Sequence, residues 1–452
     1  MPSGSCRETH GTQADGGNGG PLNATLRFQR GMRPQTGVAM SRRDPSSSTE
    51  LLGASGEGAA AFDFDIFDPA FVRDPFPFLA RLRETRPVAH TDRWGGQWLP
   101  TRYADIAAIA GDSQRFSSVT VSVTGTKPGE GPLFIGPPVT LDPPMHGPIR
   151  RLLLPAFSAA AIERLVPITR EIARDLLREL AERGGDRADA ASDYAQHLPV
   201  RVIAGMLGVP VEEEARFTDW VVRILKVGPT QPEVLVAASR EVRDYFAAQI
   251  EQRRLDPHPP QDLISYLINA EIDGAPLEHK HIIGILYVLL MAGIDTTWSS
   301  LGASLWHLAT HPQDRARLVA EPALMPTAIE EFLRLYSPAT MARIVTEEVE
   351  IGGERIYPGE RVLLSYPAAN RDPAVFEHPD EPIIDRAINR HAAFGLGIHR
   401  CLGSNLARME LQVGLEEWLL AFPSFRLDED AEVKWNGGQV RGPSAVPLII
   451  ER

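Results

Sequence analysis

Apolar positions recur every three or four residues along most of this chain, which is the spacing of one face of an α-helix. The longest stretch with this pattern runs from about residue 145 to residue 336. It predicts helices over residues 145–157, 159–183, 197–207, 211–226, 233–255, 261–270, 278–310, 312–320 and 326–336. Shorter helices are predicted over 77–84 and 103–111, and a late one from Cys401 to about Phe422.

Strand patterns are confined to shorter stretches. Residues 88–99 predict a hairpin that turns at or near Gly95 and Gly96. A strand-rich segment follows at 342–366, with a second hairpin over 349–356. A final β region covers about 433–450. The predicted fold class is therefore mainly α with small β-sheets.

The first 60 residues have a different character. They are rich in Gly, Ser, Thr, Asn and Arg and lack periodicity, so they cannot bury enough apolar surface to fold. We predict a disordered tail over residues 1–60 and a single domain over residues 61–452. Translation could start at Met1 or at Met40, and the sequence does not distinguish the two. Within the domain, Gly, Thr and Pro over residues 119–140 predict a long binding loop.

Composition narrows the class of protein. The 452 residues are 43% hydrophobic and 23% charged, which is ordinary for a protein with a sizeable core. The net charge of −13 argues against nucleic acid as a partner. The two cysteines, Cys6 and Cys401, predict no disulfide framework and a reducing, cytoplasmic location. The best apolar run, 282–292, is shorter than the roughly 18 residues of a membrane span, so no membrane association is predicted.

The candidate chemistry lies in the ten residues that end at Gly403. Gly395 and Gly397 permit backbone conformations that a β-carbon forbids, and they let the chain approach something flat and bulky. Cys401 lies at the start of the predicted helix, where free N–H groups and the helix dipole favour a thiolate. Arg400 beside it adds to this effect, so we expect a lowered thiol pKa. Such a thiolate is a metal ligand or a nucleophile, and the plain alternative is a buried structural cysteine.

This run of ten residues resembles the haem-binding loop of the cytochrome P450 superfamily: Phe394-Gly395-Leu396-Gly397-Ile398-His399-Arg400-Cys401-Leu402-Gly403. The resemblance implies a cytochrome P450 fold and a haem b cofactor. It also implies that Cys401 is the ligand of the haem iron and that Phe394, Gly395, His399 and Gly403 help to bind the haem. With the motifs below, the resemblance covers residues 62–452.

The helix predicted over 278–310 has an unusual middle. Its apolar run continues into Met291-Ala292-Gly293-Ile294-Asp295-Thr296-Thr297. Ala292 and Thr296 share a face, with Gly293 beside them, and small residues there leave room for a ligand the size of dioxygen. The Thr296 hydroxyl can bond back to a carbonyl and bend the helix. The plain alternative is close helix contacts with a solvated Asp295, but a charge within an apolar helix requires a partner or a purpose.

The same run resembles the oxygen-binding helix of the family, with its acid–alcohol pair. The resemblance implies that Thr296 orients dioxygen and that Asp295 helps relay the protons that cleave the O–O bond. Ala292 and Gly293 are then expected to lie beside the haem.

Three more residues resemble the buried Glu-x-x-Arg network of the family. Glu331 and Arg334 are spaced i, i+3, so they share a helix face and can pair. Alone, such pairs are usually surface salt bridges. Arg386 falls where the third member of the network belongs, in Asp385-Arg386-x-x-Asn389-x-His391. The implied role is structural, as a guanidinium–carboxylate network beneath the haem loop.

Haem propionates need cationic or donor partners, and four residues match the positions that the family uses. His146 and Arg150 are spaced i, i+4 in a run that resembles Asp-Pro-Pro-x-His-x-x-x-Arg, with Met145 in place of the usual acidic residue. Arg343 and His391 match the remaining positions. Taken singly, each of these is more often a surface charge.

The resemblance also implies a reaction and its partners. The chain is expected to be a monooxygenase that inserts one atom of O2 into a small hydrophobic or aromatic organic substrate, by hydroxylation or O-dealkylation. Residues 292–343 resemble the haem domains of self-sufficient fused monooxygenases, but no reductase follows within the 452 residues. Electrons are therefore expected from a ferredoxin or flavodoxin with an NAD(P)H-dependent reductase. Arg400 and Arg408 predict a basic face for that partner.

The walls of the substrate pocket are expected to come from several segments. The helix contributes Leu289, Ala292, Gly293 and Thr296. The other segments are residues 119–140, 211–235, 339–341 and 444–446.

Other classes of function stay open at this point. A peroxide-driven haem-thiolate enzyme generally lacks an Asp–Thr pair, so Asp295 and Thr296 argue against it. A non-catalytic haem sensor would need neither a proton relay nor an electron partner. A thiol nucleophile built on Cys401 would need a general base, for which His399 is near in sequence. A zinc site would need three or four ligands, and no second cysteine lies near Cys401.

Overall fold

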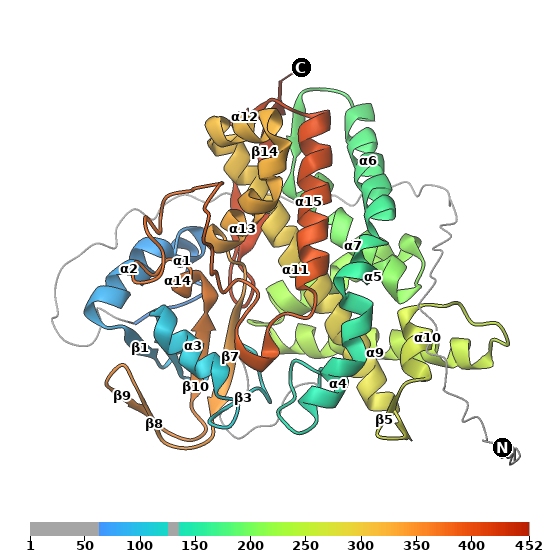
Figure 1. Ribbon diagram of the computed structural model, residues 1–452, viewed down its shortest axis with the longest axis vertical. Helices are drawn as coiled ribbons and strands as arrows, with labels where there is room; N and C mark the ends of the chain where they lie inside the picture. Colours follow the sequence, from blue (N-terminus) through green and yellow to red (C-terminus); the bar gives the residue numbers. More distant parts are fainter. Residues whose placement is uncertain (1–62, 125–134, 452) are drawn as a thin grey trace, which may run out of the picture.

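The structure is a computed structural model, and it describes residues 63–124 and 135–451. The tail predicted over residues 1–60 lies outside these residues, as does the middle of the loop predicted over 119–140. Helices form one side of the molecule, and the largest sheet lies on the other side (Figure 1).

The described helices follow the apolar spacing closely, and helix α3 has the predicted bounds. Their bounds are α1 (Pro69–Arg73), α2 (Phe76–Thr85), α3 (Tyr103–Gly111), α4 (His146–Leu153), α5 (Ala159–Glu163), α6 (Val166–Glu182), α7 (His197–Leu207), α8 (Glu214–Val221), α9 (Pro232–Leu255), α10 (Leu263–Ile268), α11 (His279–Thr310), α12 (Pro312–Ala320), α13 (Met325–Leu335), α14 (Tyr366–Ala369) and α15 (Ser404–Ala421).

The predicted and observed helices differ most in three places. The helix predicted over 159–183 breaks into α5 and α6, because Pro167 occupies the first turn of a new helix. The helix predicted over 211–226 divides into a 3-10 turn, α8 and a π-turn, η6 (Val222–Val227). Helix α15 begins at Ser404, three residues after the predicted start at Cys401.

The strands form five small sheets. The largest has the order β1 (Val88–Thr91), β2 (Gln97–Pro100), β10 (Arg361–Ser365), β7 (Thr340–Val345), β3 (Phe116–Ser117), and only its β2–β10 pair is parallel. A second has the order β11 (Phe425–Leu427), β14 (Pro447–Ile450), β4 (Arg187–Asp189). The others are hairpins: β5 (Glu271–Ile272) with β6 (Ala275–Pro276), β8 (Val349–Ile351) with β9 (Glu354–Ile356), and β12 (Lys434–Asn436) with β13 (Gly442–Ala445). Both predicted hairpins, over 88–99 and 349–356, are confirmed.

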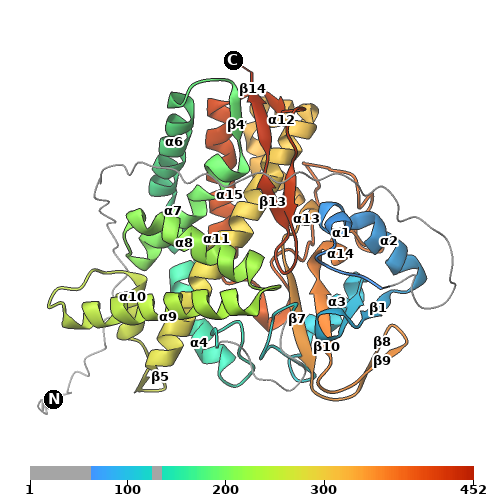
Figure 2. The ribbon, with the colours of Figure 1, turned by 180° about the vertical axis from the view of Figure 1, so that it is seen from behind.

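Helix α11 is the axis of the core. It contacts α7, α8, α9 and α15, and Figures 1 and 2 show it among these helices, with α8 labelled in Figure 2. Within the described residues it is the single unbroken helix long and apolar enough to cross a membrane. However, 78% of its most apolar 18-residue window is buried inside the protein, as in the core helix of a globular fold.

The predicted network of Glu331, Arg334 and Arg386 is present and buried. Arg334 donates from Nε and Nη2 to the two carboxylate oxygens of Glu331, at 2.8 and 2.7 Å. Its other three N–H groups donate to the carbonyls of Asn370, Pro379 and Glu381, so all five donors are used. Arg386 donates from Nε to Glu331 at 3.0 Å. These bonds fix helix α13 to the segment that leads into the loop containing Cys401.

We expect Arg334→Ala to cost about 3–5 kcal/mol of stability, because the buried Glu331 would lose one of its two arginine partners and three carbonyls would lose their donor. Urea unfolding followed by circular dichroism measures this cost. The matched control is Arg317→Ala, which removes an exposed pair with Asp385 near the same segment and should change little. Equal losses in the two variants would contradict the structural role of the buried network.

Candidate functional site

The loop that contains Cys401 is closed on itself and pressed against helix α3. The Cys401 N–H donates to the Phe394 carbonyl at 2.7 Å, and the 3-10 turn η8 (Gly397–His399) lies between them. Gly395 and Gly397 have φ of 72° and 68°, as their predicted conformational freedom requires. A β-carbon at Gly397 would lie 2.0 Å from the Ala110 carbonyl. The close approach at this glycine is therefore to α3, and not to the flat ligand expected from the sequence.

Cys401 is accessible at the surface of the loop but lies deep among protein atoms. This desolvation raises the pKa of its thiol, while the Gly403 N–H and the charges of Arg150, Arg400 and Arg408 act to lower that pKa. The expected lowered pKa of the free thiol is wrong, because burial of the thiol outweighs the groups that lower its pKa. Helix α15 also begins at Ser404, so Cys401 lies outside its first turn. A bound metal ion deprotonates a coordinating thiol by its own charge, so this correction leaves the metal-ligand reading intact.

The unusual middle of α11 exposes small residues within a buried helix. Ala292 is exposed, and Gly293 and Thr296 are half-buried, although their neighbours in the helix are buried. The Thr296 hydroxyl donates to the Ala292 carbonyl at 2.8 Å, which is the predicted backward bond. A β-carbon at Gly293 would lie 3.3 Å from Ile203 of α7. Glycine at this position therefore lets α11 and α7 pack closely.

Asp295 is fully buried and has a cationic partner that lies far away in the sequence. Lys226, from the π-turn η6, places its Nζ 2.7 Å from Asp295 Oδ1. Burial raises the pKa of Asp295, and the Lys226 ammonium and the Ser299 hydroxyl act against that rise. The alternative of a solvated Asp295 is therefore wrong. The sequence gave no signal for Lys226, because no motif joins residues 69 positions apart.

Several buried cationic or donor groups lie around the loop without a carboxylate partner. Arg343 is 3% exposed, and among the described residues no carboxylate lies within ion-pair distance of it. Its Nη1 donates to the Ala342 carbonyl at 2.8 Å. His146 is 4% exposed, and its Nε2 has no hydrogen-bond partner in the described part of the chain. The ring of His146 lies 4.3 Å from the ring of His399.

His399 and Arg150 complete this group. Burial, together with the charge of Arg343, lowers the pKa of His399 to about 3, so its ring is neutral. Its Nε2 lies 3.0 Å from the Ser118 hydroxyl, and its hydrogen bond is therefore to Ser118 and not to Cys401. This pairing argues against His399 as the base of a thiol nucleophile. Arg150 donates to the Arg400 carbonyl and so ties α4 to the cysteine loop.

His391 does not join this group. Its Nε2 pairs with Glu330 at 3.0 Å, and its Nδ1 accepts from the Ala393 N–H at 3.2 Å. Both ring nitrogens are used within the protein, so the expected contact of His391 with a propionate stays a prediction. Glu330 also receives two bonds from Arg408, at 2.6 and 2.8 Å. The charge of Arg408, expected to face a partner, is therefore neutralised within the protein.

Glu410 of α15 is a buried acid that the sequence analysis missed. It is 1% exposed, and neither carboxylate oxygen meets hydrogen-bond geometry with a described group. Burial raises the pKa of Glu410 to about 8, while the nearby Thr297 hydroxyl acts to lower it. The neutral Glu410 carboxyl therefore lies beside Thr297, the residue after Thr296. Its signal in the sequence was an acidic residue on the apolar side of α15, next to Met409 and Leu411.

Residues from several of the segments expected to line the pocket lie near one another on β7 and at Gln439. Met341 and Arg343 lie two residues apart on β7, so their side chains point to the same face. Gln439 donates from Nε2 to Met341 Sδ at 3.5 Å, and its carbonyl accepts from the Thr340 N–H at 2.9 Å. Residues 444–446 were expected here, but Val446 is buried in the core.

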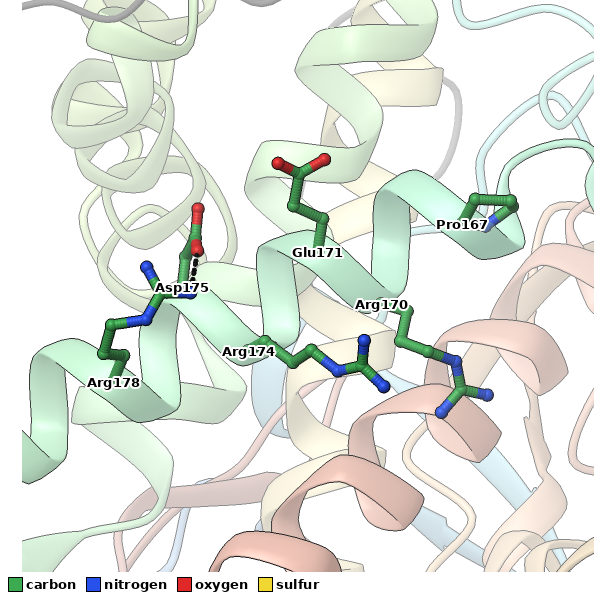
Figure 3. Close-up of a pocket in the computed structure, with 6 residues that line it drawn as sticks. All are labelled: Pro167, Arg170, Glu171, Arg174, Asp175 and Arg178. Atoms are coloured by element: carbon green, nitrogen blue, oxygen red, sulfur yellow. Dashed lines mark ion pairs between the residues drawn. The ribbon is translucent and has the colours of Figure 1, made fainter.

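A separate shallow groove lies on helix α6 and is not this site. It is lined by Pro167, Arg170, Glu171, Arg174, Asp175 and Arg178, drawn in Figure 3. Its arginines are already paired, since Arg170 and Arg174 bond to Glu416 and Glu417 of α15. Arg178 pairs with Asp175 on its own helix. The groove therefore offers no unpaired arginine to an anionic ligand.

Comparison with known proteins gives consistent results. The family described as Cytochrome P450 matches residues 214–436. Mycinamicin IV hydroxylase/epoxidase of Micromonospora griseorubida is 37% identical over 377 residues, which cover 81% of this chain and 94% of that protein. Nocardicin C N-oxygenase of Nocardia uniformis subsp. tsuyamanensis is 38% identical over 384 residues, which cover 83% and 95%. The crystal structure of PksS, a cytochrome P450 of Bacillus subtilis 168, has a TM-score of 0.77 at 32% identity and covers 86% of this chain and 100% of that one.

The residues in place fit a haem with one protein ligand to its iron. Cys401 offers a single accessible sulfur, and no cluster of three or more His, Cys, Asp or Glu in residues 63–124 and 135–451 is placed to hold a metal ion. The buried Arg343 guanidinium and the unpartnered His146 Nε2 suit the anionic propionates. The accessible backbone at Ala292 and Thr296 suits a ligand lying against α11.

We expect Arg343→Gln to release haem roughly ten- to a hundredfold faster, because each charge-assisted hydrogen bond contributes about 1.5–3 kcal/mol. Transfer of haem to apomyoglobin measures this rate. The matched control is Arg361→Gln, since Arg361 is equally buried on the neighbouring strand β10 and donates to the Trp94 carbonyl. Equal acceleration in both variants would mean that the effect comes from the sheet and not from the site.

Proposed function

We propose that this chain, which belongs to the cytochrome P450 family and is a haem-dependent monooxygenase, inserts one atom of O2 into a small hydrophobic or aromatic organic substrate. The observation that carries this proposal is the combination of one accessible cysteine in the loop with an accessible Thr296 beside the buried Asp295. A haem sensor would need no such acid. The haem, when bound, supplies the oxygen chemistry, and a thiolate ligand favours O–O cleavage.

Thr296 and Asp295 are the residues that handle protons in this proposal. The Thr296 hydroxyl donates a hydrogen bond to the Ala292 carbonyl. Its oxygen therefore keeps its lone pairs free to accept hydrogen bonds on the accessible side of α11. The Asp295 carboxylate, one position earlier, accepts and releases a proton at its oxygens. Glu410 is a neutral acid on the α15 side of the same helix and can hold a second proton.

We infer that the cofactor is haem b, held without a covalent link. Covalent attachment of haem c uses a Cys-x-x-Cys-His run, and the sequence has one cysteine at residue 6 and one at residue 401. We also infer a cytoplasmic location, because NAD(P)H and its reductases are cytoplasmic and two cysteines suit a reducing compartment.

The proposed size of the substrate rests on the described walls. Thr296, Met341 and Gln439 are half-buried, and the wall is mainly apolar with one amide. A larger substrate is the second candidate. Three exposed apolar side chains suit a wide opening: Ile135, on the loop that packs against α11 at Gly284, Val222 of η6, and Val236 of α9. The named relatives act on mycinamicin IV and nocardicin C, and a Bacillus megaterium relative at 30% identity is known in complex with testosterone.

Labelled oxygen tests the proposed reaction. Ethylbenzene serves as a hydroxylation probe, with NADPH, a surrogate ferredoxin, its reductase and 18O2 in the presence of catalase. We expect 1-phenylethanol that carries one 18O atom. Product that forms only from added hydrogen peroxide would favour the peroxide-driven alternative and contradict the proposal.

We expect Thr296→Ala to lower the product formed per NADPH about tenfold and to raise peroxide release, because proton delivery loses its acceptor next to the substrate. Product and peroxide are measured in the same reactions. The matched control is Thr310→Ala, because Thr310 also donates to the carbonyl four residues earlier but lies at the end of α11. A normal ratio of product to peroxide in Thr296→Ala would refute the assigned role.

We infer that the electron donor is a ferredoxin or flavodoxin that binds the face formed by α4 and the cysteine loop. Arg151 and Arg400 are exposed there, and no carboxylate of the described residues pairs with either. Leu154, which follows α4, is 46% exposed and adds an apolar contact. Such basic faces suit acidic redox proteins.

We expect Arg151→Glu to raise the KM for ferredoxin several-fold while kcat at saturating ferredoxin stays near normal. Steady-state cytochrome reduction at varied ferredoxin concentration measures both. Arg408 is unsuitable for this test, since its reversal would break the pair with Glu330. The control is Arg178→Glu on α6, and an equal rise in KM there would indicate a general effect of charge.

A further inference from the structure

The ion pair between Glu330 and Arg408 joins helices α13 and α15 and reaches the cysteine loop. Arg408 donates from Nε and Nη2 to the two carboxylate oxygens of Glu330, at 2.6 and 2.8 Å. The side chains of Glu330 and Arg408 are 28% and 33% exposed, so water shields the pair only in part. A bidentate pair fixes the orientation of the guanidinium as well as its distance. The two charges therefore have defined positions.

Glu330 carries its charge at neutral pH. Burial acts to raise the pKa of Glu330, but the hydrogen bonds from Arg408 and His391 and the charge of Arg408 outweigh it and lower that pKa to about 2. His391 adds no charge of its own, because its Nδ1 accepts from the Ala393 N–H and is therefore unprotonated. The cluster thus holds one negative and one positive charge, and they balance.

The ring of Phe394 connects this cluster to the cysteine loop. The Arg408 guanidinium lies 4.4 Å from the centre of the ring, which is within cation–π distance. The His391 ring lies 5.9 Å from the same centre. The Phe394 carbonyl accepts the hydrogen bond from the Cys401 N–H at 2.7 Å. Arg408 therefore contacts the residue that closes the loop around Cys401.

The charge of Arg408 also reaches the Cys401 sulfur. Arg150, Arg400 and Arg408 are the cations that act on this thiol in favour of the thiolate. Of these three, Arg408 alone forms an ion pair with a carboxylate of the described residues. Glu330 therefore moderates the one cation that acts on the sulfur and also contacts Phe394.

We propose that Glu330 and Arg408 are positioning residues that set the reduction potential of the haem iron, because their charges balance next to the point where the cysteine loop closes. This inference rests on the proposed function, since it concerns the transfer of one electron from the reduced ferredoxin or flavodoxin to the iron. The donor protein loses the electron, the iron gains it, and no bond forms or breaks. Reduction adds one negative charge to the site, so a nearby cation favours it and a nearby anion opposes it.

The balance predicts opposite effects from the two partners. Glu330→Gln leaves the charge of Arg408 uncompensated, so we expect the equilibrium constant for reduction to rise about three- to tenfold. Arg408→Gln leaves the charge of Glu330 uncompensated and should lower this constant by a similar factor. These factors correspond to about 30–60 mV for a one-electron couple. The double variant lacks both charges and should lie near the wild type.

Spectroelectrochemical titration of the substrate-free, haem-loaded protein measures the reduction potential without turnover. The matched control is Glu214→Gln, because Glu214 of α8 also pairs with an arginine and a histidine, Arg201 and His197 of α7. These three residues are not among the charged groups that act on the Cys401 thiol. The control makes the same change in net charge as Glu330→Gln, and its potential should stay at the wild-type value.

The signs of the shifts decide the result. Shifts of the same sign in Glu330→Gln and Arg408→Gln, no shift in either, or an equal shift in Glu214→Gln would overturn the inference. A double variant that departs from the wild type as far as either single variant would also overturn it, because that pattern indicates lost packing. If Arg408→Gln folds poorly, Arg408→Lys takes its place and should lie near the wild type, while Glu330→Gln still raises the potential. A wild type that makes no labelled product would instead overturn the proposed function, and the potentials would still stand or fall independently.

Discussion

Buried charges must find partners, and this constraint shapes the region around the candidate site. Arg334 and Glu331 meet it completely, since every N–H of the guanidinium and both oxygens of the carboxylate are bonded. Asp295 meets it through a single ammonium, and Glu410 avoids it by staying protonated. The first arrangement is rigid, and the other two leave acids that can exchange protons. The same physical rule thus separates the scaffold from the residues that carry chemistry.

The cationic groups that remain unpaired are as informative as the pairs. Arg343 and His146 are buried and form no ion pair within the described residues, whereas Arg408 and His391 share Glu330. Uncompensated donors inside a protein imply that an anion completes the site. Two propionates would supply that charge.

Much of the fold could be predicted because its signals are local. Helix α3, the two hairpins and the backward bond of Thr296 depend on residues a few positions apart. The site residues on the loop and on α11 were likewise found from short motifs. Their roles stay predictions, since motif order does not measure what a residue does.

The misses involve contacts between distant segments or small changes in helix geometry. The partner of Asp295 comes from a π-turn, whose extra residue has no marker in the apolar spacing. The pairing of His391 with Glu330, which lies 61 positions away, also had no marker in the sequence. The pKa of Cys401 was judged from a helix start that the structure places three residues later. In each case, packing decided what sequence order left open.

The carbon monoxide difference spectrum of the dithionite-reduced protein tests the central claim most directly. The account predicts a strongly red-shifted Soret band, because a Cys401 thiolate bound to the haem iron donates electron density to it. A band at the position of histidine-ligated haem, or no haem band at all, would contradict the assignment of Cys401 as the ligand.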